Sequence, residues 1–163
     1  MTELRALTLW RPWDEPVACG AKPVENRSWS PPKAIVGQVI AIHAGKTHDH
    51  DARGFIIDRG YHLLSLAESN RRAGAIVGVT RIVAAFTEGD LKFDTVDRFK
   101  GNELYVERRT RVLESPWFFG PWGWLLEDAI AIDPVPCKGA MGLWRVPPDV
   151  AAEVLRRVEA KRA

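Results

Sequence analysis

Apolar residues recur along the chain in short stretches that alternate with polar residues or are rich in β-branched residues. Both patterns are typical of β-strands. The predicted strands are residues 4–10, 22–29, 38–44, 75–84, 122–132 and 142–146. Near the C-terminus the spacing changes to that of a helix, which Pro147-Pro148-Asp149 would begin. Its apolar stripe would consist of Val150, Val154, Leu155 and Val158.

Helix signals lie between the predicted strands. Asp14 is expected to cap a short helix, and Gly20 is expected to end it. Asp49 or Asp51 is expected to cap a second helix that runs towards Leu66. Residues 87–115 are charged and interrupted by glycine, which predicts loops and short helix. Strands with inserted helices, but without regular β-α-β alternation, indicate an α+β domain on a mostly antiparallel sheet or small barrel.

Composition narrows the class of protein. The chain has 163 residues, of which 46% are hydrophobic, enough for a core in one domain. Its net charge of +2 excludes a histone-like polycation. Cys19 and Cys137 lie far apart, which argues against a disulfide framework or a zinc knuckle. No stretch reaches the roughly 18 apolar residues of a membrane span, so we expect a cytoplasmic protein without a membrane partner.

Candidate chemistry concentrates between residues 10 and 29. If residues 23–29 are extended, Glu25, Arg27 and Trp29 project to one face, with Lys22 in the turn before them. A tryptophan can stack on a base, and Lys or Arg can pair with phosphate. A glutamate can accept a hydrogen bond from the exocyclic amine of cytosine. The simpler interpretation places the tryptophans in the core and makes Glu25 and Arg27 a structural ion pair.

The spacing G-x-K-x-x-E-x-R, present as Gly20, Lys22, Glu25 and Arg27, resembles the signature of the activating signal cointegrator homology (ASCH) domain. This family belongs to the PUA-like superfamily. The opening strand with its Trp10-Arg11-Pro12-Trp13 sequence is also similar to the family. Further similar segments are residues 39–44, 124–127, 134–139 and 142–144, so the resemblance covers about residues 4–146.

The resemblance implies a fold and its boundaries. We expect an α+β, PUA-like, mostly antiparallel β-barrel with inserted helices. The ASCH domain would span residues 1–146, with a helical insert at about 48–115. Residues 147–163 would form a C-terminal amphipathic helix that packs on the domain.

The resemblance also implies function. It predicts a module that binds RNA, another single-stranded nucleic acid or a nucleoside, in a cleft lined by the signature residues. Some family members are linked to RNA cleavage, and small bacterial members hydrolyse acetylated cytidine with a lysine and a threonine three residues later. This sequence keeps Lys22 but has Glu25 in place of that threonine, which puts that reaction in doubt.

Two alternatives stay open. In a hydrolase acting on RNA or a modified nucleoside, Lys22 would serve as base or electrostatic stabiliser and Glu25 as general acid/base. In a protein-interaction domain, the insert, the C-terminal helix or an exposed patch of Trp117, Phe118 and Phe119 would contact a protein partner.

The remaining candidates follow from their positions. His43 ends a strand and could face the cleft, although a satisfied buried histidine is the simpler interpretation. Lys46 is expected at the rim, as a phosphate contact. We expect no cofactor and no metal, because His48 and His50 would point apart and no second ligand cluster is found. The predicted ligand-binding residues are Trp10, Arg11, Trp13, Lys22, Glu25, Asn26, Arg27, Trp29, His43, Lys46, Trp122 and Trp124, with core packing expected for at least one of the last two.

Overall fold

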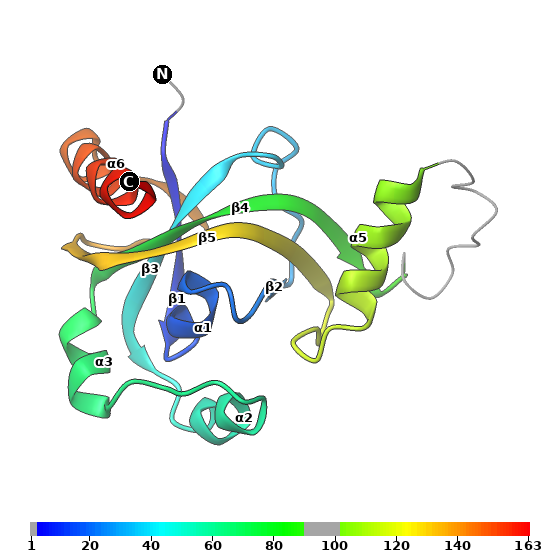
Figure 1. Cartoon of the computed structure of the whole chain (residues 1–163), viewed down its shortest axis with the longest axis horizontal. Coiled ribbons are helices and arrows are strands. Elements are labelled where there is room, and N and C mark those ends of the chain that lie inside the picture. Colours follow the sequence, from blue (N-terminus) through cyan, green and yellow to red (C-terminus); the bar gives the residue numbers. More distant parts are fainter. Residues whose placement is uncertain (1–2, 90–101) are drawn as a thin grey trace. The chain divides into compact units, whose positions relative to one another are not determined.

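The computed structural model describes residues 3–89 and 102–163 (Figure 1). The strands are β1 (Arg5–Arg11), β2 (Val24–Arg27), β3 (Val39–His48), β4 (Ala75–Thr87), β5 (Trp122–Pro136) and β6 (Leu143–Arg145). The helices are α1 (Asp14–Ala18), α2 (Ala52–Asp58), α3 (Leu66–Arg72), α5 (Glu103–Leu113) and α6 (Pro148–Arg162). The protein is therefore an α+β protein, as the sequence predicted.

The strands form one six-stranded sheet in the order β2-β5-β4-β3-β1-β6. β1 pairs in parallel with β3 and antiparallel with β6, and β2 pairs antiparallel with β5. The sheet is therefore mixed. Within the described residues β2 and β6 are its end strands, so the sheet is not closed and the predicted barrel is not confirmed.

The chain divides into two compact units, each described here by itself. The first comprises the residues up to Ala21, Val39–Thr80 and Asp128–Ala163. The second comprises Lys22–Gln38 and the described part of Arg81–Glu127. The long strands β4 and β5 run through both units.

The core of the first unit lies between its strands and α6. Buried residues come from every strand of the unit and from the helix: Leu4, Ala6, Ala41, Ile76, Val79, Ile132, Val135, Trp144, Val146, Val154 and Val158. The side chain of Arg157 further anchors α6, because it donates to the carbonyls of Asp133 and Pro134 at 3.0 Å each. Leu155 was predicted in the apolar stripe but is exposed, so the stripe follows a spacing of four residues.

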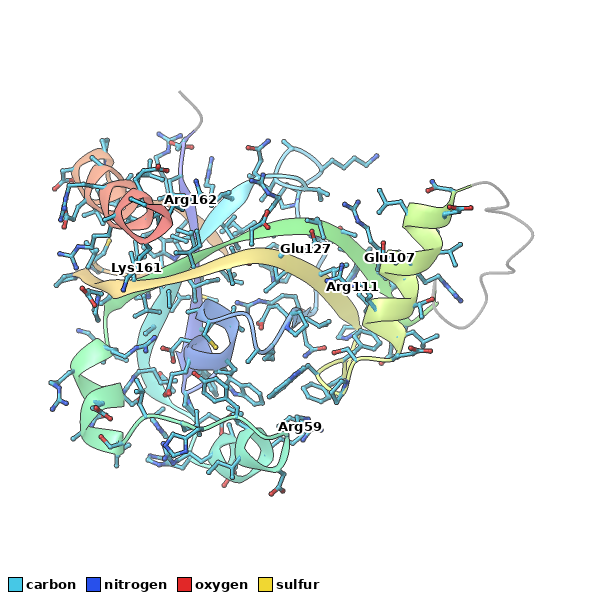
Figure 2. All side chains as sticks on the ribbon, viewed as in Figure 1. Arg59, Glu107, Arg111, Glu127, Lys161 and Arg162 are labelled. Carbon is cyan, nitrogen blue, oxygen red and sulfur yellow. The ribbon has the colours of Figure 1, made fainter. Side chains whose placement is uncertain are left out.

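The polar face of α6 is charged. Figure 2 shows Lys161 and Arg162 in its last turn, where cations interact favourably with the helix dipole. In the second unit α5 carries Arg111, which pairs with Glu107 and with Glu127 of β5 (Figure 2). The charge of Arg111 is therefore already paired with acidic side chains.

Two predictions about helices need correction. Asp14 does not cap α1; it is the first residue of that helix, while Gly20 follows the helix end with a φ of +85°, as predicted. The helix expected to run towards Leu66 ends at Asp58. A separate helix, α3, begins at Leu66 after its N-cap Ser65, whose side chain forms a capping box with Glu68.

Other sequence predictions agree with the structure or lie outside it. All predicted strands are confirmed, although β3, β4 and β5 extend further than expected. The prediction of loops and short helix in residues 87–115 falls partly on residues 90–101, which lie outside the described residues. None of the helices that the structure describes is both long and apolar enough to cross a membrane.

Candidate functional site

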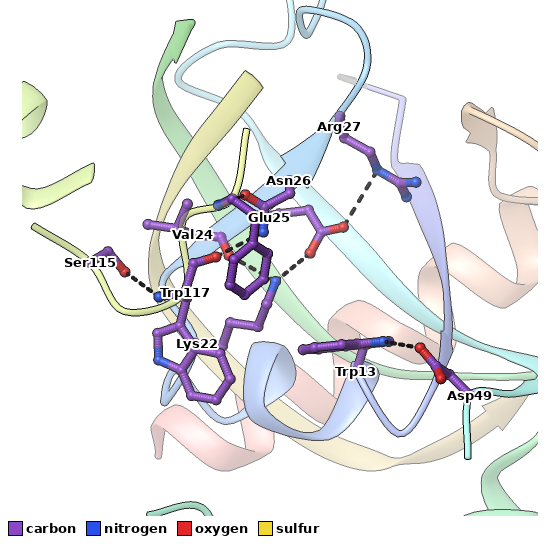
Figure 3. A network of polar contacts seen from close by, with 10 residues as sticks. Trp13, Lys22, Val24, Glu25, Asn26, Arg27, Asp49, Ser115 and Trp117 are labelled. Atoms are coloured by element: carbon purple, nitrogen blue, oxygen red, sulfur yellow. Dashed lines mark hydrogen bonds and ion pairs between the residues drawn. The ribbon is translucent and has the colours of Figure 1, made fainter. Parts of the chain in front are cut away.

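The charged residues of the G-x-K-x-x-E-x-R sequence form a compact array in the second unit (Figure 3). The Lys22 ammonium donates to Glu25 Oε2 at 2.7 Å and to the Val24 carbonyl at 2.8 Å. The other carboxylate oxygen of Glu25 lies 3.5 Å from Arg27 Nε. Alternation along β2 places Glu25 and Arg27 on one face, so the carboxylate lies between two cations, as the extended pattern predicted.

Burial separates the three charges. The Lys22 and Glu25 side chains are 3% and 9% exposed, whereas the Arg27 side chain is 25% exposed. Removing one partner of a buried ion pair leaves an uncompensated charge, which typically costs about 3–5 kcal/mol. The fold therefore tolerates the loss of neither Lys22 nor Glu25 alone, and Arg27 is the member of the array most open to solvent.

The tryptophans of the second unit differ in access. Trp124 is fully buried, and its indole nitrogen donates to the Trp29 carbonyl at 3.1 Å. The two rings meet edge to face, with centroids 4.8 Å apart. Trp124 is therefore a core residue and has no face available for a base, as expected for at least one of Trp122 and Trp124. Trp29 and Trp122 are half-buried.

Asn26 has a structural task in the second unit. Its side-chain amide donates to the Trp117 carbonyl at 2.8 Å, and its side-chain carbonyl accepts from the Phe119 N–H at 2.8 Å. These bonds hold the turn before β5, which leaves little of the amide for a ligand. Trp117 is buried, so the predicted exposed patch of three aromatic residues does not form.

Two predicted binding residues of the first unit also have internal partners. Arg11 is buried and donates to the carbonyls of Gly45 and Lys46 at 2.8 and 2.9 Å and to Asn70 Oδ1 at 2.8 Å. Its guanidinium ties β3 to α3, and its role as a ligand contact stays a prediction. Trp13 donates from its indole nitrogen to Asp49 at 3.1 Å (Figure 3).

Trp13 belongs to the first unit, whereas Lys22, Glu25, Arg27 and Trp29 belong to the second. The cleft predicted from these five residues stays a prediction.

A pocket of about 700 Å³ opens within the first unit. Its walls come from β1, from the end of β3, from the residue before β4 and from the segment after β5. The lining residues are Thr8, His43, Gly45, Lys46, Gly74, Cys137, Lys138, Gly139, Ala140 and Met141. The structure thus brings together His43 and Lys46, both predicted from the sequence. It adds Lys138 and Gly139, which the sequence marks by the glycine-punctuated run at residues 137–142 and by the family-like segment 134–139, and also Gly45 and Gly74.

His43 is an uncharged wall of this pocket. Its Nε2 lies 2.8 Å from the Cys137 carbonyl, which can only accept, so Nε2 carries the proton. Its Nδ1 lies 3.2 Å from the Thr8 hydroxyl, which itself accepts from the Trp144 indole nitrogen at 3.0 Å. Burial lowers the pKa of His43, although its hydrogen bonds to backbone carbonyls act in the opposite direction. The ring is therefore neutral at physiological pH.

Gly139 closes the pocket wall against His43. A Cβ atom at this position would lie 2.5 Å from His43 Cε1 and 2.9 Å from the Thr8 hydroxyl oxygen. Only glycine lets the backbone approach the ring this closely.

The charged groups at the pocket are all positive. Lys46 and Lys138 are exposed, and neither forms an ion pair with another described residue. No carboxylate is among the lining residues. Trp10 lies two residues after Thr8 on β1, where the pairing register with β3 shifts, and it is 60% exposed. The pocket therefore has two available ammonium groups in its lining, and an exposed indole follows on the same strand.

A second polar cluster in the first unit is buried. Asp14 and Glu15 are only 1% and 2% exposed. Asp14 accepts from Arg72 of α3 at 3.1 Å, and Glu15 accepts from the Leu64 N–H at 2.8 Å. Burial raises the pKa of both carboxyls, that of Asp14 to about 6, although Arg72 acts in the opposite direction. The sequence predicted neither contact.

The prediction that His48 and His50 point apart is wrong. Their ring centroids lie 4.4 Å apart, with the ring planes tilted by 41°. In the part of the chain that the structure describes, no three His, Cys, Asp or Glu side chains gather in a group that could hold a metal ion.

The mixed α+β fold can be compared with known proteins. No family model and no curated protein sequence matches the chain. Among solved structures, the ASCH protein of Zymomonas mobilis is similar with a TM-score of 0.52 and 15% identity, over 94% of each chain. A serine-to-alanine mutant of that protein gives a TM-score of 0.52 and 16% identity, over 94% of this chain and 95% of that one. A tyrosine-to-phenylalanine mutant gives 0.51 and 12%, over 95% and 98%. The chain therefore has the fold of an ASCH domain, as its sequence resemblance implied.

Proposed function

We propose that this protein binds single-stranded RNA and holds one nucleotide in the pocket of the first unit. The observation that carries the proposal is a pocket lined by Lys46 and Lys138 and by no carboxylate. The exposed Trp10 lies two residues beyond the lining residue Thr8 on β1. At about 700 Å³, the pocket falls in the range of roughly 300–1,000 Å³ that is usual for ligand sites. The choice of RNA over DNA rests on the ASCH resemblance of the sequence.

Each group has a defined task in this proposal. A base stacks on the Trp10 indole, an interaction worth about 1–3 kcal/mol in single-strand binders. Lys46 and Lys138 pair with phosphate oxygens, and each such contact adds about 0.7 to the salt slope of binding.

The test is a titration of a short, fluorescently labelled, unstructured RNA followed by anisotropy. We expect Trp10→Ala to weaken binding about 5- to 150-fold, from the stacking energy it removes. We expect Lys46→Met to weaken binding and to lower the salt slope by about 0.7. Lys161→Met, which removes an exposed cation of α6, is the matched control for net charge.

Two results would overturn the proposal. One is the absence of binding by the wild type. The other is equal affinity of the wild type and Trp10→Ala for the RNA, because that result would show that the Trp10 indole does not stack on a base. A DNA oligonucleotide of the same sequence, run in parallel, tests the preference for RNA.

A hydrolase remains the second candidate, and the buried Lys22–Glu25 pair is the observation that favours it. Functional sites often hold charged groups whose environment is set by burial and a specific partner. Incubation with unstructured RNA and with acetylated cytidine, followed by chromatography, tests turnover. Product from the wild type but not from Lys22→Ala would favour this candidate, whereas no product from either would exclude these reactions.

A further inference from the structure

The segment between β5 and β6 has free backbone donors at the pocket. The Cys137 N–H donates to the Gly74 carbonyl at 3.0 Å, and pairing with β1 resumes at Leu143. Between these points, no N–H of residues 138–142 donates a hydrogen bond to another residue in the described part of the chain. Residues 138–141 all line the pocket. We call residues 138–142 the pocket loop.

Successive backbone N–H groups can form a concave site that favours anions where the chain adopts a turn conformation. Two glycines give the pocket loop its shape: Gly139 lies against His43, and Gly142 has a φ of +67°. At Gly139 the backbone, rather than a side chain, therefore faces the His43 ring.

The charges around the pocket loop also favour an anion. Lys138 belongs to the loop and Lys46 lines the same pocket, whereas His43 is neutral and no carboxylate is in the lining. The lining side chains therefore carry two formal positive charges, one on each lysine. A phosphomonoester carries close to two negative charges at neutral pH, whereas an internal phosphodiester carries one. The monoester therefore matches the charge of the pocket better.

We propose that the pocket loop, with Lys46 and Lys138, is a phosphate subsite that prefers a phosphomonoester to an internal phosphodiester. The nucleotide identity of the ligand rests on the proposed function. The phosphate subsite itself rests on the pocket loop and the two lysines. The same chemistry is supplied by the terminal phosphate of an RNA strand or by free phosphate.

The experiment uses the full chain labelled with ¹⁵N, whose amide signals report on each backbone N–H. Inorganic phosphate, adenosine monophosphate and adenosine are titrated in turn at constant ionic strength, which is held with chloride. We expect saturable shifts of the amides of residues 138–142 with the two phosphates and not with adenosine. We expect Lys138→Met to weaken phosphate binding at least about fivefold, and Lys161→Met to leave it unchanged.

A second arm compares RNA that carries a terminal phosphate with the same RNA ending in hydroxyl groups, by anisotropy. Tighter binding of the phosphorylated strand, lost in Lys138→Met, supports the monoester preference, and equal affinity of the two strands overturns it. Shifts that do not saturate, or that chloride alone produces, overturn the phosphate subsite.

The two proposals can fail separately. RNA binding without a response of the pocket loop to phosphate would overturn the subsite and leave the proposed function standing. A saturable response to phosphate in a protein that binds no RNA would support the subsite and overturn the proposed function.

Discussion

Asp14 allows a direct test of the structure through the pH dependence of stability, because burial disfavours the ionised form of its carboxyl group. Its carboxyl is 1% exposed, and burial raises its pKa from 3.8 to about 6. The folded protein therefore holds a proton on Asp14 more tightly than the unfolded chain does. Asp14 thus favours folding while it is protonated, and this contribution is lost as the pH rises from about 4 to 6. At ~1.36 kcal/mol per pH unit, the change amounts to about 3 kcal/mol.

The geometry explains why Arg72 does not offset this cost. Its guanidinium contacts Asp14 Oδ2 at 3.1 Å, whereas Oδ1 is buried without a hydrogen-bond partner among the described residues. One contact therefore replaces the hydration of a whole carboxylate. In Asp14→Asn the side-chain carbonyl can still accept from Arg72, but the buried negative charge is gone.

The assay is urea unfolding of the wild type and Asp14→Asn at a series of pH values from 4 to 7.5. At pH 4 we expect similar free energies of unfolding for the two proteins. Above pH 6 we expect Asp14→Asn to be more stable by about 3 kcal/mol, because the wild type then buries an ionised carboxylate. Asp133→Asn, at an exposed carboxyl of β5, controls for the loss of one charge.

A stability difference that does not change with pH would refute this reasoning. A difference that changes in the opposite direction would show that the Arg72 ion pair outweighs burial. Glu15 keeps its own pH dependence in both proteins, because burial also raises its pKa, so only the difference between the variants is diagnostic.

Three further predictions follow from contacts. Gly139→Ala should lower the free energy of unfolding by about 1–3 kcal/mol, since its Cβ would overlap the His43 ring. The control Gly54→Ala in α2, where a Cβ would have nothing within 4 Å, should not lower it. Equal urea midpoints for the wild type and Gly139→Ala would contradict this prediction. Glu25→Gln should cost about 3–5 kcal/mol by leaving the Lys22 ammonium buried without its counter-charge, and adding Lys22→Met should recover stability in a double-mutant cycle. Trp10→Ala should change stability by less than about 0.5 kcal/mol, because the ring is largely exposed; a larger loss in thermal unfolding would undermine its use in binding assays.

The strands could be predicted from the sequence because their signal is local. The run from Ala75 to Ala84 is rich in β-branched residues, and it lies within β4. The β2 array was also accessible, because the alternation of side chains fixes which residues share a face. The spacing of Lys22, Glu25 and Arg27 does not predict how deeply each side chain is buried, because burial depends on which residues cover the strand.

The pocket could not be predicted from the sequence, because its walls are distant in the chain. His43 meets the Cys137 carbonyl across 94 positions, and Thr8 meets the Trp144 indole across 136. The same reason explains the error at Asp14. An aspartate before a short helix is typical of a cap, but here its partner is Arg72, 58 positions away.

The basic residues show where a nearly neutral chain has charge available for an anion. Arg11 and Lys22 are buried and hydrogen-bonded to groups of the protein, so their charge serves the fold. Lys46 and Lys138 are exposed without an ion-pair partner in the described residues and meet at one pocket. The sequence shows all four simply as cations, and the family signature draws attention to Lys22. Because a ligand can use only charge that the fold has not already neutralised, the pocket rather than the Lys22–Glu25 pair is the stronger candidate for phosphate.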